Sequence, residues 1–167
     1  MMLTRLNALA DRLIGLSALL GTLGLLAEVA VILIDVVGRY FGAPLKGAQD
    51  VSQMAMTLVV FGGMALCDRM GGHVAVDVFE NRLPTWAILL GDRISAFLGA
   101  LIFAGIAWTL VESAALSRLL NLSTNIIYLP KAHFQYIVAA MCMVTALGMT
   151  LRGIGLIVSP AQKGITP

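Results

Sequence analysis

Residues 13–37 read LIGLSALLGTLGLLAEVAVILIDVV, and this stretch decides the fold class of the chain. A helix crosses the hydrocarbon core of a bilayer, about 30 Å thick, with roughly 20 apolar residues. Arg5 and Arg12 precede the run as basic residues precede the apolar region of a secretory signal. The run continues to Val37, past the length of such a region, so we interpret it as a retained signal-anchor span.

The composition indicates an integral membrane protein. Of the 167 residues, 59% are hydrophobic and 12% are charged, whereas soluble domains carry about 25% charged residues. The chain is short enough for a single domain, which we expect over residues 1–160, with a flexible tail at 161–167. The net charge of +2 does not favour a nucleic-acid partner. Cys67 and Cys142 fall in different apolar runs, which favours buried thiols over a disulfide.

Four apolar segments are predicted to span the membrane as helices, because lipid offers no partners to unpaired backbone groups. They are residues 13–38, 51–67, 94–117 and 134–152, with bounds approximate. The first and third helices could extend over 4–40 and 85–120. At 1.5 Å per residue each would reach about 50 Å, so these two helices must tilt or project from the membrane.

Basic residues predict the orientation. Seven of them would share the side of the N-terminus: Arg5, Arg12, Arg69, Arg82, Arg93, Arg152 and Lys163. Four would lie on the opposite side: Arg39, Lys46, Arg118 and Lys131. Because positive charge is enriched in cytoplasmic segments, we expect both termini in the cytoplasm, with the protein crossing the inner membrane of a bacterium.

Charged residues inside the first span suggest structural roles. An ionisable group at mid-membrane costs about 3 kcal/mol on insertion scales, so it usually faces protein or a water-filled cavity. Glu28, Asp35 and Arg39 are spaced to share one helix face. Asp35 and Arg39 are expected to form an ion pair at the outer interface. Glu28 could hydrogen-bond to a neighbouring helix or couple transport to a proton or ion.

Residues 70–84, MGGHVAVDVFENRLP, are expected to lie on the membrane surface between the second and third spans. As a helix this amphipathic stretch puts His73 and Asp77 on one side and Phe79 on another. As a strand it alternates equally well, so periodicity does not choose. One histidine with two carboxylates is a poor metal-ligand set, and we expect no metal site. His73 and Asp77 would instead hydrogen-bond locally, while Phe79 rests in the interface or against a partner.

The chain lacks the motifs of common enzymes. No phosphate-binding loop, dinucleotide-binding turn or zinc helix is present. His73 and His133 would lie on opposite sides of the membrane, which argues against a bis-histidine haem and a redox anchor. We therefore expect neither enzymatic activity nor a cofactor.

Three stretches together resemble one family: DVVGRYFGAPLKGAQDVSQ at 35–53, GGHVAVDVFENRLP at 71–84 and YLPKAHFQYIVAA at 128–140. They are similar to the small membrane subunit of tripartite ATP-independent periplasmic (TRAP) transporters, over roughly residues 5 to 155. The matching positions are Gly38, Arg39, Tyr40, Pro44, Gly47, Gly72, His73, Val76, Asp77, Pro84 and Pro130. The chain has Gln49-Asp50 where the family often has two acids, and Asp50 can still serve as the acid.

The resemblance implies a scaffold. In that family the small subunit packs, within the lipid, against a large multi-span permease subunit that holds the substrate and sodium sites. A periplasmic binding protein delivers an organic acid, and ion gradients rather than ATP drive uptake. The residues expected to serve structure or partner contact are Glu28, Asp35, Arg39, Tyr40, Asp50, His73, Asp77 and Phe79.

One alternative keeps Glu28 at the centre. Small four-span multidrug antiporters also carry a glutamate in their first span, and Glu28 could act there as a proton-coupling group. Such proteins have short loops, whereas residues 68–93 of this chain form a long connection.

Overall fold

This computed structural model describes residues 2–70 and 85–158, in which the regular secondary structure is α-helical apart from an isolated β-bridge between Ser123 and Pro130. The four helices are α1 (Met2–Tyr40), α2 (Ala48–Arg69), α3 (Thr85–Leu119) and α4 (Lys131–Val158). Each is long and apolar enough to cross a bilayer. The predicted all-α membrane protein with four spans is confirmed. The surface segment expected within 70–84 and the tail at 161–167 lie outside the described residues, apart from Met70 at the end of α2.

The helices differ in length from one another and from the expected spans. At 1.5 Å per residue, the 39 residues of α1 and the 35 of α3 extend about 58 and 52 Å. The expectation that these two are overlong is therefore confirmed. The 22 residues of α2 extend about 33 Å, close to the hydrocarbon thickness. The fourth helix is longer than predicted, because it begins directly after Pro130 and continues through Gly153 and Gly155.

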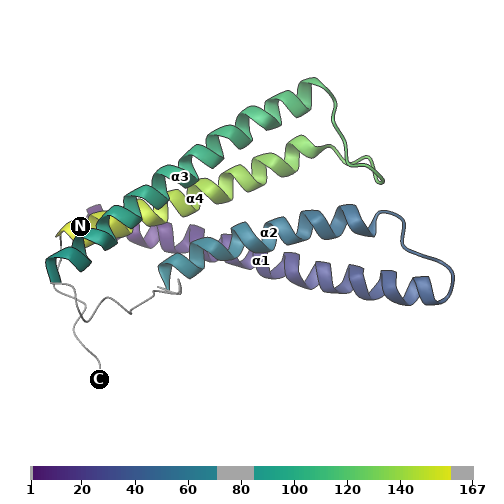
Figure 1. The fold of residues 1–167 in the computed structure, drawn as a ribbon, viewed down its shortest axis with the longest axis horizontal. Helices are drawn as coiled ribbons and strands as arrows, with labels where there is room; N and C mark the ends of the chain where they lie inside the picture. Colours follow the sequence, from purple (N-terminus) through teal and green to yellow (C-terminus); the bar gives the residue numbers. More distant parts are fainter. Residues whose placement is uncertain (1, 71–84, 159–167) are drawn as a thin grey trace.

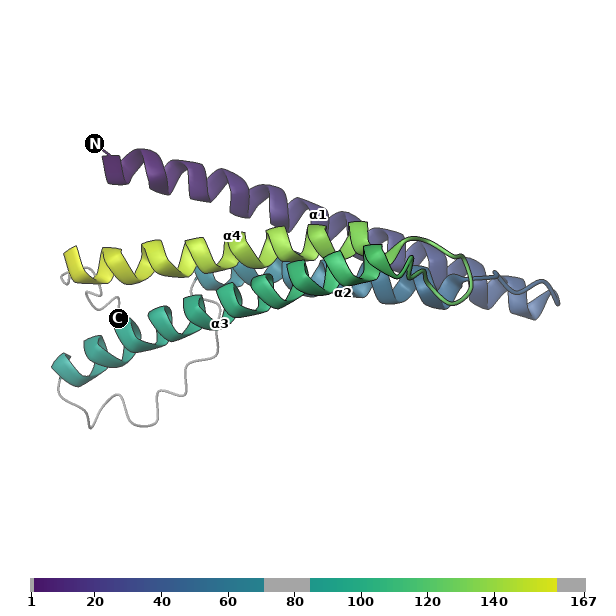
Figure 2. The ribbon, with the colours of Figure 1, turned by 90° about the horizontal axis from the view of Figure 1, so that it is seen from above.

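The helices form two antiparallel hairpins that cross. In Figure 1, α1 lies beside α2 and α3 beside α4, and the hairpins diverge toward the connectors at 41–47 and 120–130. We call this the connector end; α1 begins and α4 ends at the opposite, terminus end. In the perpendicular view of Figure 2, α4 lies between α1 and α3 near the terminus end. The connectors therefore share one end of the molecule.

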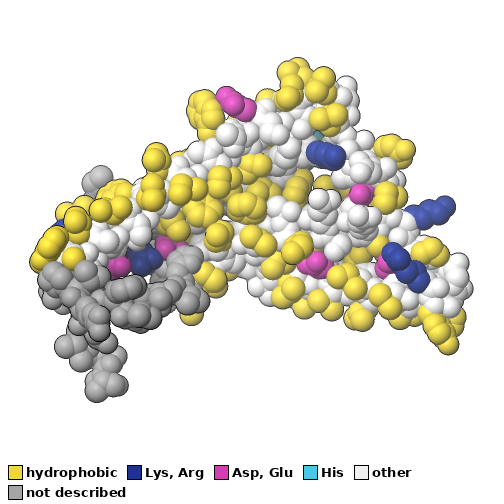
Figure 3. Space-filling model, viewed as in Figure 1, with side chains coloured by type: hydrophobic (Ala, Val, Ile, Leu, Met, Phe, Trp, Pro, Cys, Tyr) yellow, Lys and Arg dark blue, Asp and Glu magenta, His cyan; other side chains and the backbone are white. Residues whose placement is uncertain are grey.

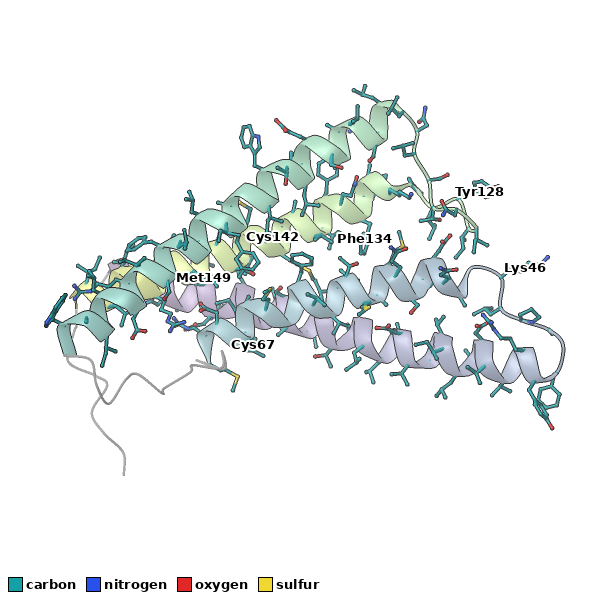
Figure 4. All side chains as sticks on the ribbon, viewed as in Figure 1. Lys46, Cys67, Tyr128, Phe134, Cys142 and Met149 are labelled. Atoms are coloured by element: carbon teal, nitrogen blue, oxygen red, sulfur yellow. The ribbon has the colours of Figure 1, made fainter. Side chains whose placement is uncertain are left out.

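The core is built around α4. Half of the most apolar part of α4 is buried within the chain, against 17% for α1 and α2 and 22% for α3. The described buried hydrophobic residues of α3 are all alanines except Phe103, and such small side chains let two helices approach closely. The core residues are Ala100, Phe103 and Ala107 on α3 and Val138, Cys142, Ala146 and Met149 on α4. Figure 4 labels Cys142 and Met149 along α4, and Figure 3 shows many hydrophobic side chains at the surface on the face in view.

In the first hairpin, α1 and α2 pack closely where Gly21 faces Gly62. A Cβ added at Gly62 would lie 2.6 Å from the Ser17 carbonyl oxygen and 2.8 Å from the Gly21 Cα, so backbone touches backbone there. Gly62 therefore lets α1 and α2 approach closely. The neighbouring Gly63 is different, because a Cβ there would meet nothing within 4 Å.

We expect Gly62→Ala to destabilise the protein by about 1–3 kcal/mol, because the added methyl group meets backbone that cannot move aside. Thermal unfolding of the purified protein in detergent measures the effect. Gly63→Ala is the matched control; it should leave stability unchanged or raise it slightly, since alanine favours helix over glycine. Equal losses from both substitutions would contradict the close crossing.

Candidate functional site

Polar side chains join the helices at both ends of the molecule. At the terminus end, Arg152 Nη1 of α4 donates to Asp68 Oδ1 of α2 over 2.6 Å. The Asp68 side chain is 7% exposed, and a carboxylate that deep is costly unless a counter-charge and hydrogen bonds compensate it. Since Asp68 and Arg152 belong to different hairpins, this ion pair fixes one hairpin to the other.

Two further contacts at this end act within the hairpins. Arg69 Nε lies 2.7 Å from Asp11 Oδ1 and joins α2 to α1. The Arg93 guanidinium donates to the Leu156 carbonyl oxygen over 3.0 and 3.3 Å and joins α3 to α4. In the sequence these arginines indicate only the orientation of the chain, yet each also holds a pair of helices together.

At the connector end, Asp50 joins the two hairpins as Asp68 does at the terminus end. Its Oδ2 accepts hydrogen bonds from the backbone amides of Ile126 and Ile127, at 2.8 and 3.1 Å. Asp50 is buried in the first turn of α2, and the two amides belong to the 120–130 connector of the other hairpin. Hydrogen bonds to an ionised acceptor are shorter and stronger than neutral ones. Asp50 therefore connects the two hairpins where they otherwise diverge.

The connector is shaped to present those amides. Within it, the Thr124 amide donates to the Leu129 carbonyl over 2.9 Å, and the Leu129 amide donates to Thr124 Oγ1 over 3.1 Å. Tyr128, labelled in Figure 4, has a φ of 58°, which a residue with a bulky side chain adopts only where its surroundings hold it. The 120–130 connector is thus held in its conformation by hydrogen bonds of its own.

Gly47 completes the contact from the α2 side. Its φ of 86° is in the left-handed region, which favours glycine. The Ile127 side chain packs so closely on Gly47 that an added Cβ would collide with it. A glycine is therefore required at position 47 both for its backbone conformation and for space.

The expected residues at the end of α1 form a second local group. Asp35 and Arg39 make the predicted ion pair, at 2.8 Å between Oδ2 and Nη2. The other carboxylate oxygen of Asp35 accepts the Leu45 amide over 3.0 Å, which fastens the 41–47 connector to α1. Tyr40 is 87% exposed, and its ring meets Phe41 edge to face. This group acts within the first hairpin only.

Glu28 also contacts its own hairpin. Ser52 Oγ of α2 donates to Glu28 Oε1 of α1 over 3.2 Å. This is the helix-to-helix hydrogen bond that the structural interpretation of Glu28 expected.

The sequence-predicted residues do not form one site. Glu28, Asp35 and Asp50 each bond to a different partner, and the described residues contain no group of three or more histidine, cysteine, aspartate or glutamate side chains that could hold a metal ion. His73, Asp77 and Phe79 lie outside the described residues. What the geometry does provide is a set of fixed links between helices at both ends.

Comparison with known families identifies the protein class. The model for the DctQ component of tripartite ATP-independent periplasmic transporters matches residues 28–162. The chain belongs to this family. Searches among curated proteins and among solved structures found no match. The DctQ component is the small membrane subunit of these transporters and is not an enzyme, so both expectations are confirmed.

We expect Asp50→Ala to let the hairpins move apart at the connector end, because the Ile126 and Ile127 amides lose their acceptor. Spin labels at Gln49→Cys and Tyr128→Cys, in a chain with both native cysteines replaced, would report a longer and broader distance distribution. Asp35→Ala is the control: it removes a carboxylate from the same end that acts within one hairpin, so the distance should not change. An unchanged distance in Asp50→Ala would refute the linking role.

Proposed function

We propose that this DctQ component is a scaffold that supports the large permease subunit during uptake of an organic acid. The uptake would be driven by a sodium gradient, with the acid delivered by a periplasmic binding protein. The observation that carries the proposal is what the buried carboxylates bond to. Asp50 and Asp68 both bond across the two hairpins. Side chains bonded in this way fix the arrangement of the two hairpins.

Family membership supports the partners. A tripartite transporter has components besides this one, which implies a large permease and a periplasmic binding protein. The exposed surface supports the same proposal, because α1 carries a long series of apolar side chains that its own chain leaves uncovered. Lipid or a neighbouring membrane subunit must cover them. A frame that is fixed at both ends is suited to bracing a partner that moves.

The role of Glu28 separates the scaffold from the antiporter alternative. A coupling carboxylate would have to exchange protons or ions during each cycle, whereas Glu28 accepts a hydrogen bond from Ser52. This bond supports a structural role in the first hairpin. We propose the same kind of role for Asp35, Arg39 and Tyr40 at the end of α1, and for His73, Asp77 and Phe79 in the surface segment.

We further propose that both termini face the cytoplasm. The two connectors that share one end of the molecule would then face the periplasm, where the binding protein arrives. The excess of basic residues on the other side supports this orientation.

The scaffold function predicts that the affinity-tagged chain co-purifies with a large permease in a fixed ratio when expressed with its neighbouring genes. Reconstituted in liposomes, that complex should take up a labelled organic acid only with the binding protein outside and an inward sodium gradient, without ATP. Glu28→Gln should retain most of this uptake. Uptake or proton exchange by the purified chain alone, abolished by Glu28→Gln, would support the antiporter instead.

The orientation predicts that cysteines at Lys46→Cys and Lys131→Cys react with a membrane-impermeant maleimide in intact spheroplasts. Cys67, which is exposed, would be replaced by serine beforehand. A cysteine at Gln162→Cys provides the control and should react only after the membrane is broken. The reverse pattern would invert the topology.

A further inference from the structure

A small polar pocket lies at the connector end, where the second hairpin turns. It has a volume of about 260 Å³, and we call it the turn pocket. Figure 1 shows the 120–130 connector joining the end of α3 to the start of α4, and residues of these three segments line the pocket. The polar groups of its lining belong mainly to Ser117, Arg118, Asn121, Tyr128, Ala132 and His133.

The turn pocket lies outside the hydrocarbon. Trp108 is exposed on α3 and its indole Nε1 donates to Glu112 Oε1 over 3.0 Å. Exposed tryptophans are typical of the membrane interface, and an exposed carboxylate such as Glu112 is costly against acyl chains. Arg118 is six residues beyond Glu112, about 9 Å further along the helix. Because the headgroup layer is only about 5–8 Å thick, a partner in the aqueous phase can reach the pocket.

The turn pocket carries positive charge without a counter-charge. Arg118 and His133 line it, and no described aspartate or glutamate does. Among the described residues, the Arg118 guanidinium makes neither an ion pair nor a hydrogen bond. Asp50 interacts with Lys131 and accepts two backbone amides, and both residues line a different cavity at this end. The charge of Arg118 is therefore left for a partner.

The end of α3 does not need the Arg118 side chain as a cap. Basic side chains near a helix C-terminus can bond to carbonyl groups that the helix leaves unpaired. Here the Ser117 carbonyl accepts the Leu122 amide over 2.8 Å, and the Arg118 carbonyl accepts the Asn121 amide over 3.3 Å. The connector thus supplies the donors for these carbonyls, and the guanidinium remains available.

Other donors of the turn pocket also lack an acceptor. Ser117 is 5% exposed, yet its hydroxyl forms no hydrogen bond within the described part of the chain. Buried hydroxyls nearly always have a partner. In the first turn of α4, the amides of Ala132 and His133 have no acceptor among the described residues either. A guanidinium, a hydroxyl and free amides together suit an anion with several acceptor positions, such as a carboxylate.

The backbone around the turn pocket is held in unusual conformations. Asn121 and Tyr128, with φ of 49° and 58°, are the only non-glycine residues with positive φ in the described ranges. Both line the turn pocket. Such conformations persist where the surrounding structure enforces them, and they cluster at functional sites. Their position is consistent with a binding role for this turn.

We propose that the turn pocket receives an aspartate or glutamate side chain of the periplasmic binding protein when that protein docks on the membrane subunits. The carboxylate pairs with the Arg118 guanidinium and accepts hydrogen bonds from the Ser117 hydroxyl and from an amide of the first turn of α4. The inference rests on the proposed function and its orientation, and it names the surface through which the small subunit takes part in delivery.

Uptake at increasing concentrations of binding protein tests the proposal, in liposomes that hold the complex of this chain with the permease. Arg118→Gln should raise the concentration for half-maximal uptake about tenfold and leave the maximal rate near the original value, because only docking is weakened. Arg118→Lys keeps the charge but not the forked geometry, so it should give a smaller rise.

Lys46→Gln is the matched control. Lys46 is exposed on the 41–47 connector at the same end, and it does not line the turn pocket. Its replacement removes the same charge, so it should change the half-maximal concentration by less than about twofold if the pocket rather than the general field attracts the binding protein.

Photo-crosslinking identifies the occupant. Tyr128 is exposed and lines the turn pocket, and azidophenylalanine at this position keeps an aromatic ring. In the complex with binding protein present, we expect mass spectrometry to identify its product as the binding protein. Azidophenylalanine in place of Trp108, which is exposed at the membrane boundary, should give no product with the binding protein.

Three results would overturn the inference. They are an unchanged half-maximal concentration in Arg118→Gln, an equal rise in Lys46→Gln, and a Tyr128 product with lipid or with the permease in place of the binding protein. Uptake by the unaltered complex would leave the proposed function standing in each case. If the unaltered complex took up no acid with the binding protein present, the proposed function would fail and the inference with it.

Discussion

The architecture depends on the absence of hydrogen-bond partners in hydrocarbon. Asp68 and Asp50 each lie within a helix that spans the bilayer, and neither could remain there as a charge without partners. Each is bonded to a partner on the other hairpin. Removing water from around a few carboxylates thus forces the two hairpins together at particular points, which hydrophobic contact between apolar helices in lipid would not do.

The two ends are joined by different chemistry. At the terminus end an arginine side chain meets a carboxylate, and long side chains of this kind tolerate small shifts between helices. At the connector end the carboxylate of Asp50 meets backbone amides of a loop with its own internal bonds, so main chain sets the geometry on the side of the loop. The helices of the two hairpins diverge at this second end. There the 120–130 connector, rather than helix packing, provides the contact between the hairpins.

Features that depend on local sequence were predictable, while contacts between distant segments were not. Hydropathy identified the four spans, and four-residue spacing identified the Asp35–Arg39 pair, because both follow from helix geometry alone. The partners of Asp50 are backbone amides more than seventy residues away, which carry no side-chain signature in the sequence. The pairing of Asp68 with Arg152 requires knowing that α2 and α4 are neighbours. The fold class therefore followed from the sequence, but the links between hairpins did not.

The position of α4 explains why this small subunit needs those links. Because the most apolar part of α4 is half buried, far more than that of the other helices, the core lies mainly in the second hairpin, and the first is attached along α2 and the crossing with α4. An attachment of limited area between apolar helices resists sliding and rotation weakly. Ionic and hydrogen-bonded contacts at the two extremities have the longest lever arm against such motion. Placing Asp50 and Asp68 at opposite ends of α2 therefore stiffens the angle between the hairpins more than the same contacts would at its middle.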